Sequence, residues 1–174
     1  MPHSTTFSSP PLAAAVVLVV DATAGVGRRI ATRLCAAGAA VAVVAAGHPG
    51  RADDAATNAA FLCKELADIG LVALPYQVDT GRPETFRALP DQIAADLGAA
   101  TACVVVIPPG GAAGPLPAAM RVASKAIAAG LPPSAVHLEV EAVEDMEDQE
   151  RLVQEVMGRL AARNSSRSSS RREC

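Results

Sequence analysis

Aromatic residues are nearly absent from this chain of 174 residues: they make up 2% of it, with no tryptophan and a single tyrosine. Proteins that bind single-stranded nucleic acids stack the bases on aromatic side chains. The net charge of −3 offers no general attraction to a phosphate backbone either. The composition therefore argues against nucleic acid as a partner.

Cysteine is also sparse, and its four copies form no CxxC pair. Structural zinc sites use closely spaced ligands, and small secreted domains use a denser set of cysteines. The three histidines, at positions 3, 48 and 137, show no metal-ligand spacing. We therefore expect no metal site, and we interpret the cysteines as reduced thiols of a cytoplasmic protein.

No apolar run reaches the 18 or more residues of a membrane-spanning helix, so we expect no membrane partner. The run "LAAAVVLVV" (12–20) has the length of a signal-peptide core. A secretory signal needs positive charge before that core, and residues 1–11 contain no lysine or arginine. We therefore interpret the run as the first strand of the fold.

What the chain does contain is a regular alternation of apolar runs and helix-like segments, with 51% hydrophobic residues overall. Continuous apolar runs are typical of parallel strands that are buried on both faces. We expect strands at 16–20, 40–46, 71–79, 101–107 and 134–143. We expect helices at 26–37, 51–70, 83–98, 118–130 and 145–162. Pro90 falls inside the third helix, where a proline kinks or splits the backbone.

This alternation predicts an α/β fold: a Rossmann-like, doubly wound parallel sheet in three α/β/α layers. One domain is expected at 12–162, between tails at 1–11 and 163–174 whose polar, low-complexity composition predicts disorder. Ligands of such folds bind outside the carboxyl ends of the strands. Those ends are the loops 21–25, 46–51, 79–82 and 107–114, and glycines cluster in three of them.

The first of these loops has the composition of a phosphate-binding turn. Gly25 and Gly27 let a pyrophosphate approach the backbone, and the helix that follows offers N–H groups and a positive dipole. Tight strand-to-helix turns use glycine in any α/β fold, so packing alone is the alternative explanation. Asp21 places a carboxylate where a phosphate loop usually has its first glycine.

The stretch "VDATAGVG" resembles the T-G-x-x-x-G-x-G fingerprint of the short-chain dehydrogenase/reductase family. Gly25 and Gly27 match its last two glycines, and Thr23 falls where a small hydroxyl residue is common. Asp21 replaces the first glycine, and Val20 replaces the threonine. The resemblance implies that Thr23, Gly25, Val26 and Gly27 bind a dinucleotide, NAD or NADP.

A second stretch, "VDTGRPETFRALPDQIAADLG" (78–98), is similar to the same family without a gap. This similarity implies that Asp79 contacts the adenine ring of the cofactor. The resemblance covers roughly residues 14 to 116 of the chain.

Beyond that region the family's catalytic features are lost. The asparagine-rich end of the family's fourth strand reads "VVIPPGG" here, and the segment that carries its catalytic serine has no counterpart. "RVASK" resembles the family's Y-x-A-S-K motif, with Ala123, Ser124 and Lys125 matching and Arg121 in place of the tyrosine. An arginine with a pKa above 12 cannot serve as the general acid near neutrality. Lys125 is therefore the one catalytic residue with a counterpart.

The choice between the two cofactors depends on the end of the second strand. An acidic residue there favours NAD and a basic one favours NADP. Ala45 and Ala46 give neither signal, whereas His48 and Arg51 just beyond them favour NADP slightly.

These observations predict a protein that binds NAD(P) in a truncated form of the family fold, without complete catalytic machinery. Two alternatives remain open. The chain is still an active NAD(P)-dependent oxidoreductase that acts on a carbonyl or alcohol, or it is an interaction protein that has lost the cofactor. A homo-oligomer is compatible with each of them.

Overall fold

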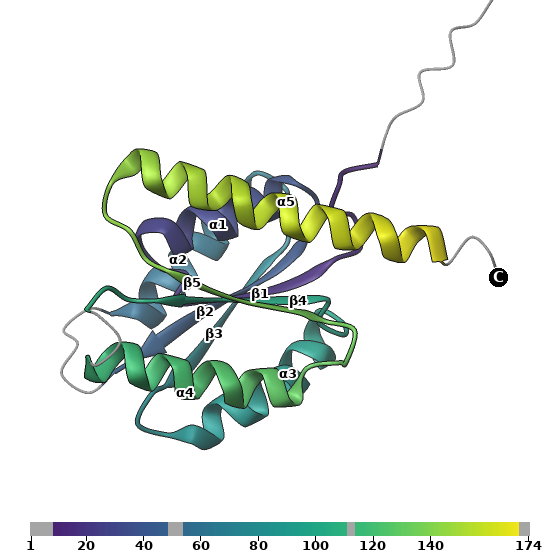
Figure 1. Cartoon of the computed structure of the whole chain (residues 1–174). Coiled ribbons are helices and arrows are strands. Elements are labelled where there is room, and N and C mark those ends of the chain that lie inside the picture. The colour runs from purple at the N-terminus through teal and green to yellow at the C-terminus, as the bar shows by residue number, and fades with distance from the viewer. Residues whose placement is uncertain (1–8, 49–53, 111–113, 171–174) are drawn as a thin grey trace, which may run out of the picture.

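The computed structural model describes residues 9–48, 54–110 and 114–170. Five strands alternate with five helices along this part of the chain (Figure 1). The strands are β1 (Val16–Val20), β2 (Ala40–Gly47), β3 (Ala73–Asp79), β4 (Ala102–Ile107) and β5 (Val136–Glu141). The helices are α1 (Gly25–Ala36), α2 (Ala55–Asp68), α3 (Pro83–Asp96), α4 (Pro115–Gly130) and α5 (Met146–Ser170).

The strands form one parallel sheet in the order β3-β2-β1-β4-β5. Every residue of the central strands β1 and β4 is buried, as their unbroken apolar sequences predict. The order reverses between β1 and β4, because the chain builds outward from β1 in one direction and then in the other. Such a reversal is the place where α/β sheets bind ligands.

Helices cover both faces of the sheet and so create two separate apolar cores (Figure 1). On one face α1, α2 and α5 pack on the sheet through residues such as Ile30, Leu62 and Val156. On the other face α3 and α4 do so through Phe86, Ile93 and Ile127. The structure confirms the predicted three-layer, doubly wound α/β fold.

Pro90 does not split α3, which continues unbroken from Pro83 to Asp96. The proline is buried, and its ring lies against α4: a Cβ added at Gly130 would be 2.9 Å from Pro90 Cγ. Gly130 thus lets α3 and α4 approach closely at Pro90. This is the proline that we expected to kink or split α3.

The last helix is longer than predicted. α5 continues past Ala162 to Ser170, so residues 163–170 are helical rather than disordered. The amide of Asn164 donates to the carbonyl oxygen of Pro11 over 2.9 Å, which attaches the helix to the opposite end of the chain. Residues 9–11 are likewise part of the described structure, and the rest of the two expected tails lies outside it.

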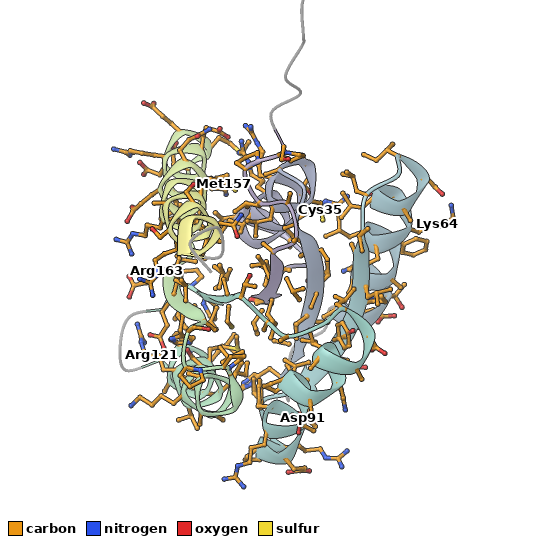
Figure 2. All side chains as sticks on the ribbon, turned by 90° about the vertical axis from the view of Figure 1, so that its right-hand side faces the viewer. Cys35, Lys64, Asp91, Arg121, Met157 and Arg163 are labelled. Carbon is orange, nitrogen blue, oxygen red and sulfur yellow. The ribbon has the colours of Figure 1, made fainter. Side chains whose placement is uncertain are left out.

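None of the helices in the described ranges is long and apolar enough to cross a membrane. Three cysteines in those ranges, Cys35, Cys63 and Cys103, are free and buried. Figure 2 shows Cys35 in the interior and Lys64 at the periphery of the molecule. No cluster of metal-ligating side chains occurs among the described residues.

Candidate functional site

The turn between β1 and α1 has a backbone conformation that depends on two residues. Asp21 and Gly25 both have positive φ angles, +61° and +51°. Glycine adopts this left-handed conformation freely, and aspartate tolerates it better than most residues do. Asp21 thus adopts the left-handed conformation that the glycine usual at this position of a phosphate loop would adopt, and it adds a carboxylate.

Gly27 is required by a close approach within the same turn. A Cβ at this position would lie 2.3 Å from the carbonyl oxygen of Asp21, closer than any real contact. At Gly25, by contrast, an added Cβ would meet nothing within 4 Å. One glycine therefore permits packing, and the other leaves open space above the turn.

The N-terminus of α1 has no side-chain hydrogen bond from its N-cap. The N-cap residue is Ala24, and no acidic residue lies in the first turn of the helix. The first N–H groups of a helix have no intrahelical acceptor and carry partial positive charge. This helix end is consequently suited to an external anion.

A cavity of about 170 Å³ opens next to this helix end. Its wall combines the β1–α1 turn with residues that follow β4 and β5, and so it spans the point where the strand order reverses. The residues that line it are Asp21, Ala24, Gly25, Val26, Val106, Pro108, Pro109, Ala142 and Val143. Sites for drug-sized ligands have volumes of roughly 300–1,000 Å³. The cavity therefore suits one part of a dinucleotide, such as its pyrophosphate.

Thr23 lies within the turn and is 5% exposed. Its hydroxyl oxygen is buried and has no hydrogen-bond partner. Buried polar atoms in proteins are rarely left unpaired, and those that are unpaired call for an explanation. Thr23 is not among the residues that line the cavity.

Searches for similar proteins give a result for structure only. No family model matches the sequence, and no curated protein matches it. Among solved structures, a hydroxysteroid dehydrogenase from Escherichia coli superposes with a TM-score of 0.59 at 22% identity, over 73% of this chain and 52% of that one.

Two further structures give the same picture. A dehydrogenase/reductase from Sinorhizobium meliloti 1021 has a TM-score of 0.56 at 23% identity, over 71% of this chain and 52% of its own. A Serratia marcescens short-chain dehydrogenase/reductase has a TM-score of 0.56 at 20% identity, over 72% and 55%. The chain has a truncated short-chain dehydrogenase/reductase-like fold. It spans about half the length of these structures.

The stretch of α4 that resembles the family's Y-x-A-S-K motif does not lie at the cavity. Lys125 is exposed, and neither it nor Arg121 lines the cavity. Arg121 instead pairs with Glu141 at the end of β5, with Nη2 and Oε1 2.9 Å apart. Ser124 is fully buried and bonds through Oγ to Nε2 of His137 over 2.8 Å.

The single tyrosine also lies away from the cavity. The hydroxyl of Tyr76 donates to Oδ2 of Asp96 over 2.9 Å, at the end of α3. Burial, together with that carboxylate, raises the pKa of the phenol well above its usual value. A phenol that acts as a general acid near neutrality needs the opposite shift, so Tyr76 is a poor candidate for that role.

Asp79 stands at the carboxyl end of β3, where the resemblance places the adenine contact. Its Oδ1 accepts a hydrogen bond of 2.8 Å from the amide of Gly81, which stabilises the turn into α3. On the neighbouring strand, Nδ1 of His48 lies 2.6 Å from Oγ1 of Thr80. Arg51, the other basic residue of this region, lies outside the described residues.

The sequence did not indicate one wall of the cavity, nor the partly buried hydrogen bond between Ser124 and His137. Ala142 and Val143 line the cavity after β5, but small apolar residues in a loop give no chemical signal. The pair of Ser124 and His137 joins α4 to β5. The alternation of "VHLEVE" was the available signal, since it places His137 on the face that α4 covers.

Proposed function

We propose that this chain binds NAD(P) at the carboxyl edge of its sheet and lacks the complete catalytic machinery of the short-chain dehydrogenase/reductases. The proposed binding residues are Thr23, Gly25, Val26, Gly27 and Asp79. One observation carries the proposal: the uncapped N-terminus of α1 opens on a cavity where the strand order reverses.

The residues of the turn would hold the pyrophosphate by backbone N–H groups. Gly25 and Val26 line the cavity, and the dipole of α1 favours negative charge at this point. The carboxylate of Asp21 lines the same cavity and weakens the binding of an anion. The proposed site is therefore one of reduced affinity.

For the cofactor itself, NADP is the slightly favoured candidate. The imidazole of His48 is held by Thr80 at the carboxyl end of β2, on the side of the sheet edge where an adenosine ribose would lie. An imidazole N–H in that place can donate a hydrogen bond to a 2′-phosphate. His48→Ala should therefore weaken the binding of NADPH more than that of NADH, and equal losses would contradict the preference.

The residues at the cavity supply no proton donor for carbonyl reduction. When bound, the nicotinamide of the cofactor supplies or accepts a hydride. Among the described residues that line the cavity, Asp21 alone is titratable. Arg121 stands at the position of the family's tyrosine and is engaged with Glu141. We therefore expect binding without turnover, as in a sensor or a subunit.

The test is a titration with NADPH and with NADH, followed by the fluorescence of the reduced cofactor. Gly25→Ala is the diagnostic variant, because its added methyl group meets no protein atom and projects into the space above the turn. Gly70→Ala is its matched control: Gly70 also has a positive φ angle and open space, but it lies at the end of α2. The two substitutions therefore carry similar backbone strain at different places.

We expect Gly25→Ala to weaken binding at least tenfold and Gly70→Ala to leave it unchanged. Equal effects of the two variants would contradict the proposed site. No fluorescence change at millimolar concentrations of either cofactor would overturn binding and favour an interaction protein. Turnover of ketones or aldehydes above background would instead support the active oxidoreductase.

A further inference from the structure

β5 forms one edge of the sheet, since within the described part of the chain it pairs with β4 alone. The opposite edge, β3, contains Pro75, a residue that blocks further pairing of an edge strand. β5 has the sequence VHLEVE and contains no proline. Its outer backbone is therefore able to accept another strand.

The outward backbone groups of β5 belong to its odd-numbered residues. The amides of Val136 and Ala142 donate to Thr101 and Ile107, on the side of β4. Backbone groups alternate along a strand, so those of Leu138 and Val140 also point toward β4. The N–H and C=O groups of His137, Glu139 and Glu141 consequently face the open edge.

The side chains of β5 also alternate between two environments. Val136, Leu138 and Val140 pack on the face that α5 covers. On the other face His137 bonds to Ser124 of α4, and Glu141 pairs with Arg121 of the same helix. One face of the strand is thus aliphatic, and the other carries one imidazole and two carboxylates.

We propose that two copies of this chain associate through β5, paired antiparallel with Leu138 opposite Leu138 of the second copy. In this register His137 lies opposite Glu139 of the other copy, twice per dimer, and the outward backbone groups of both residues bond to each other. Val136 lies opposite Val140 on the aliphatic face. The strand is therefore complementary to itself in apolar contacts and in hydrogen bonding, and it places an imidazole opposite each carboxylate of Glu139.

The neighbouring registers lack this complementarity. Centring the pair on Glu139 places two carboxylates directly opposite each other, which is destabilising in a sheet. Centring it on His137 places two imidazoles opposite each other and leaves Glu139 opposite Ala135. Shifting the register by one residue places an odd-numbered residue opposite an even-numbered one. The backbone groups of the odd-numbered residue then face the partner strand while those of the even-numbered residue face β4, so no ladder of hydrogen bonds forms.

The first test is the molecular mass of the full chain in solution, measured by sedimentation velocity across a range of concentrations. We expect a dimer, and we expect Glu139→Lys to raise its dissociation constant at least tenfold because the introduced ammonium group would face His137. Adding His137→Glu to Glu139→Lys should restore the dimer, because it places a carboxylate opposite each introduced ammonium group. Leu74→Lys on the other edge strand is the control and should leave the dimer intact.

The second test reads the register directly. Non-hydrogen-bonded antiparallel partners have Cα atoms about 4.5 Å apart, within the range of a disulfide. In a Cys174→Ser background, Leu138→Cys should therefore form a covalent dimer under mild oxidation. Val136→Cys should not, because its symmetry mate would be four residues away along the strand.

A monomeric chain that gives no covalent dimer with Leu138→Cys would overturn the proposal. So would a dimer that Leu74→Lys dissociates and Glu139→Lys does not, or cross-linking that is equal for Val136→Cys and Leu138→Cys. Neither measurement uses a dinucleotide, so this proposal succeeds or fails independently of cofactor binding.

Discussion

Gly27 lies directly against the carbonyl oxygen of Asp21, with 2.3 Å between that oxygen and the position of a Cβ at residue 27. Because both partners are backbone, the contact cannot be relieved by a side-chain rotation. We expect Gly27→Ala to lower the free energy of unfolding by about 1–3 kcal/mol, as overpacking does elsewhere. Urea unfolding followed by circular dichroism measures it.

Gly158→Ala is the control for that substitution. Gly158 lies within α5, and a Cβ there would meet nothing within 4 Å. Alanine should stabilise the helix by about 0.5–1 kcal/mol. If the two variants had equal free energies of unfolding, the close contact between residue 27 and the carbonyl oxygen of Asp21 would be contradicted.

Two substitutions of Asp21 distinguish the effect of its charge on cofactor binding from the effect of its backbone conformation. Asp21→Asn removes the charge and keeps a residue that tolerates positive φ, whereas Asp21→Gly also removes the side chain. Loss of about 1 kcal/mol of repulsion tightens binding roughly fivefold. We expect both variants to bind NADPH more tightly than the wild type does, in the same fluorescence titration. Unchanged or weaker binding by both would remove Asp21 from the phosphate site.

Glu150 joins α5 to α1 and makes part of the stability dependent on pH. Its two oxygens each lie 2.8 Å from an arginine of α1, Arg29 or Arg33. A hydrogen bond from Gln154, followed by the charges of Arg33 and Arg29, holds the pKa of Glu150 below its usual value, against the opposing effect of burial.

Since the folded-state pKa is lowered, this contribution is present above the unfolded-state pKa, about 4.3, and is lost as the pH falls through the folded-state value. Glu150→Gln should therefore melt at a lower temperature than the wild type at pH 7. The difference should narrow toward pH 3. A difference that stays constant between these pH values would show that ionisation of Glu150 does not contribute.

The three buried cysteines should be chemically inert in the folded protein. Burial raises the pKa of Cys35 to about 12, that of Cys63 to about 11 and that of Cys103 to about 12. The reactive thiolate is consequently scarce at pH 8. In a Cys174→Ser variant we expect no rapid reaction with Ellman's reagent until urea unfolds the chain, when three thiols should react. Fast labelling of the native protein would contradict this burial.

The sequence predicted the strands whose burial follows from an unbroken run of apolar residues. The continuous valine-rich runs of β1 and β4 placed both strands within a residue of their observed bounds. The predictions of a split at Pro90 and of disorder at 163–170 differ from the structure for a common reason. Local propensity disfavours a helix at each place, and contacts with distant residues, Gly130 and Pro11, accompany the helix that forms.

For the candidate site, sequence indicated the glycine turn but not the whole cavity. Gly25 and Val26 line it, while Thr23 and Lys125 do not. The direction of a side chain on α4 depends on how the helix rotates against the sheet, and a short motif does not specify that rotation. The binding and catalytic roles expected from the sequence stay predictions for the binding and turnover experiments; they concern Thr23, Gly25, Val26, Gly27, Asp79 and Lys125.

The attachment of α5 to the first helix and to Pro11 has a consequence for how the protein is made. Asn164 and Pro11 are separated by 153 residues, and Glu150 lies more than 110 residues from both arginines that it binds. The first core cannot be completed until α5 has left the ribosome. Contacts of such sequence separation form slowly, so part of this apolar core stays uncovered until then. Chaperone dependence during translation would follow from the position of this one helix.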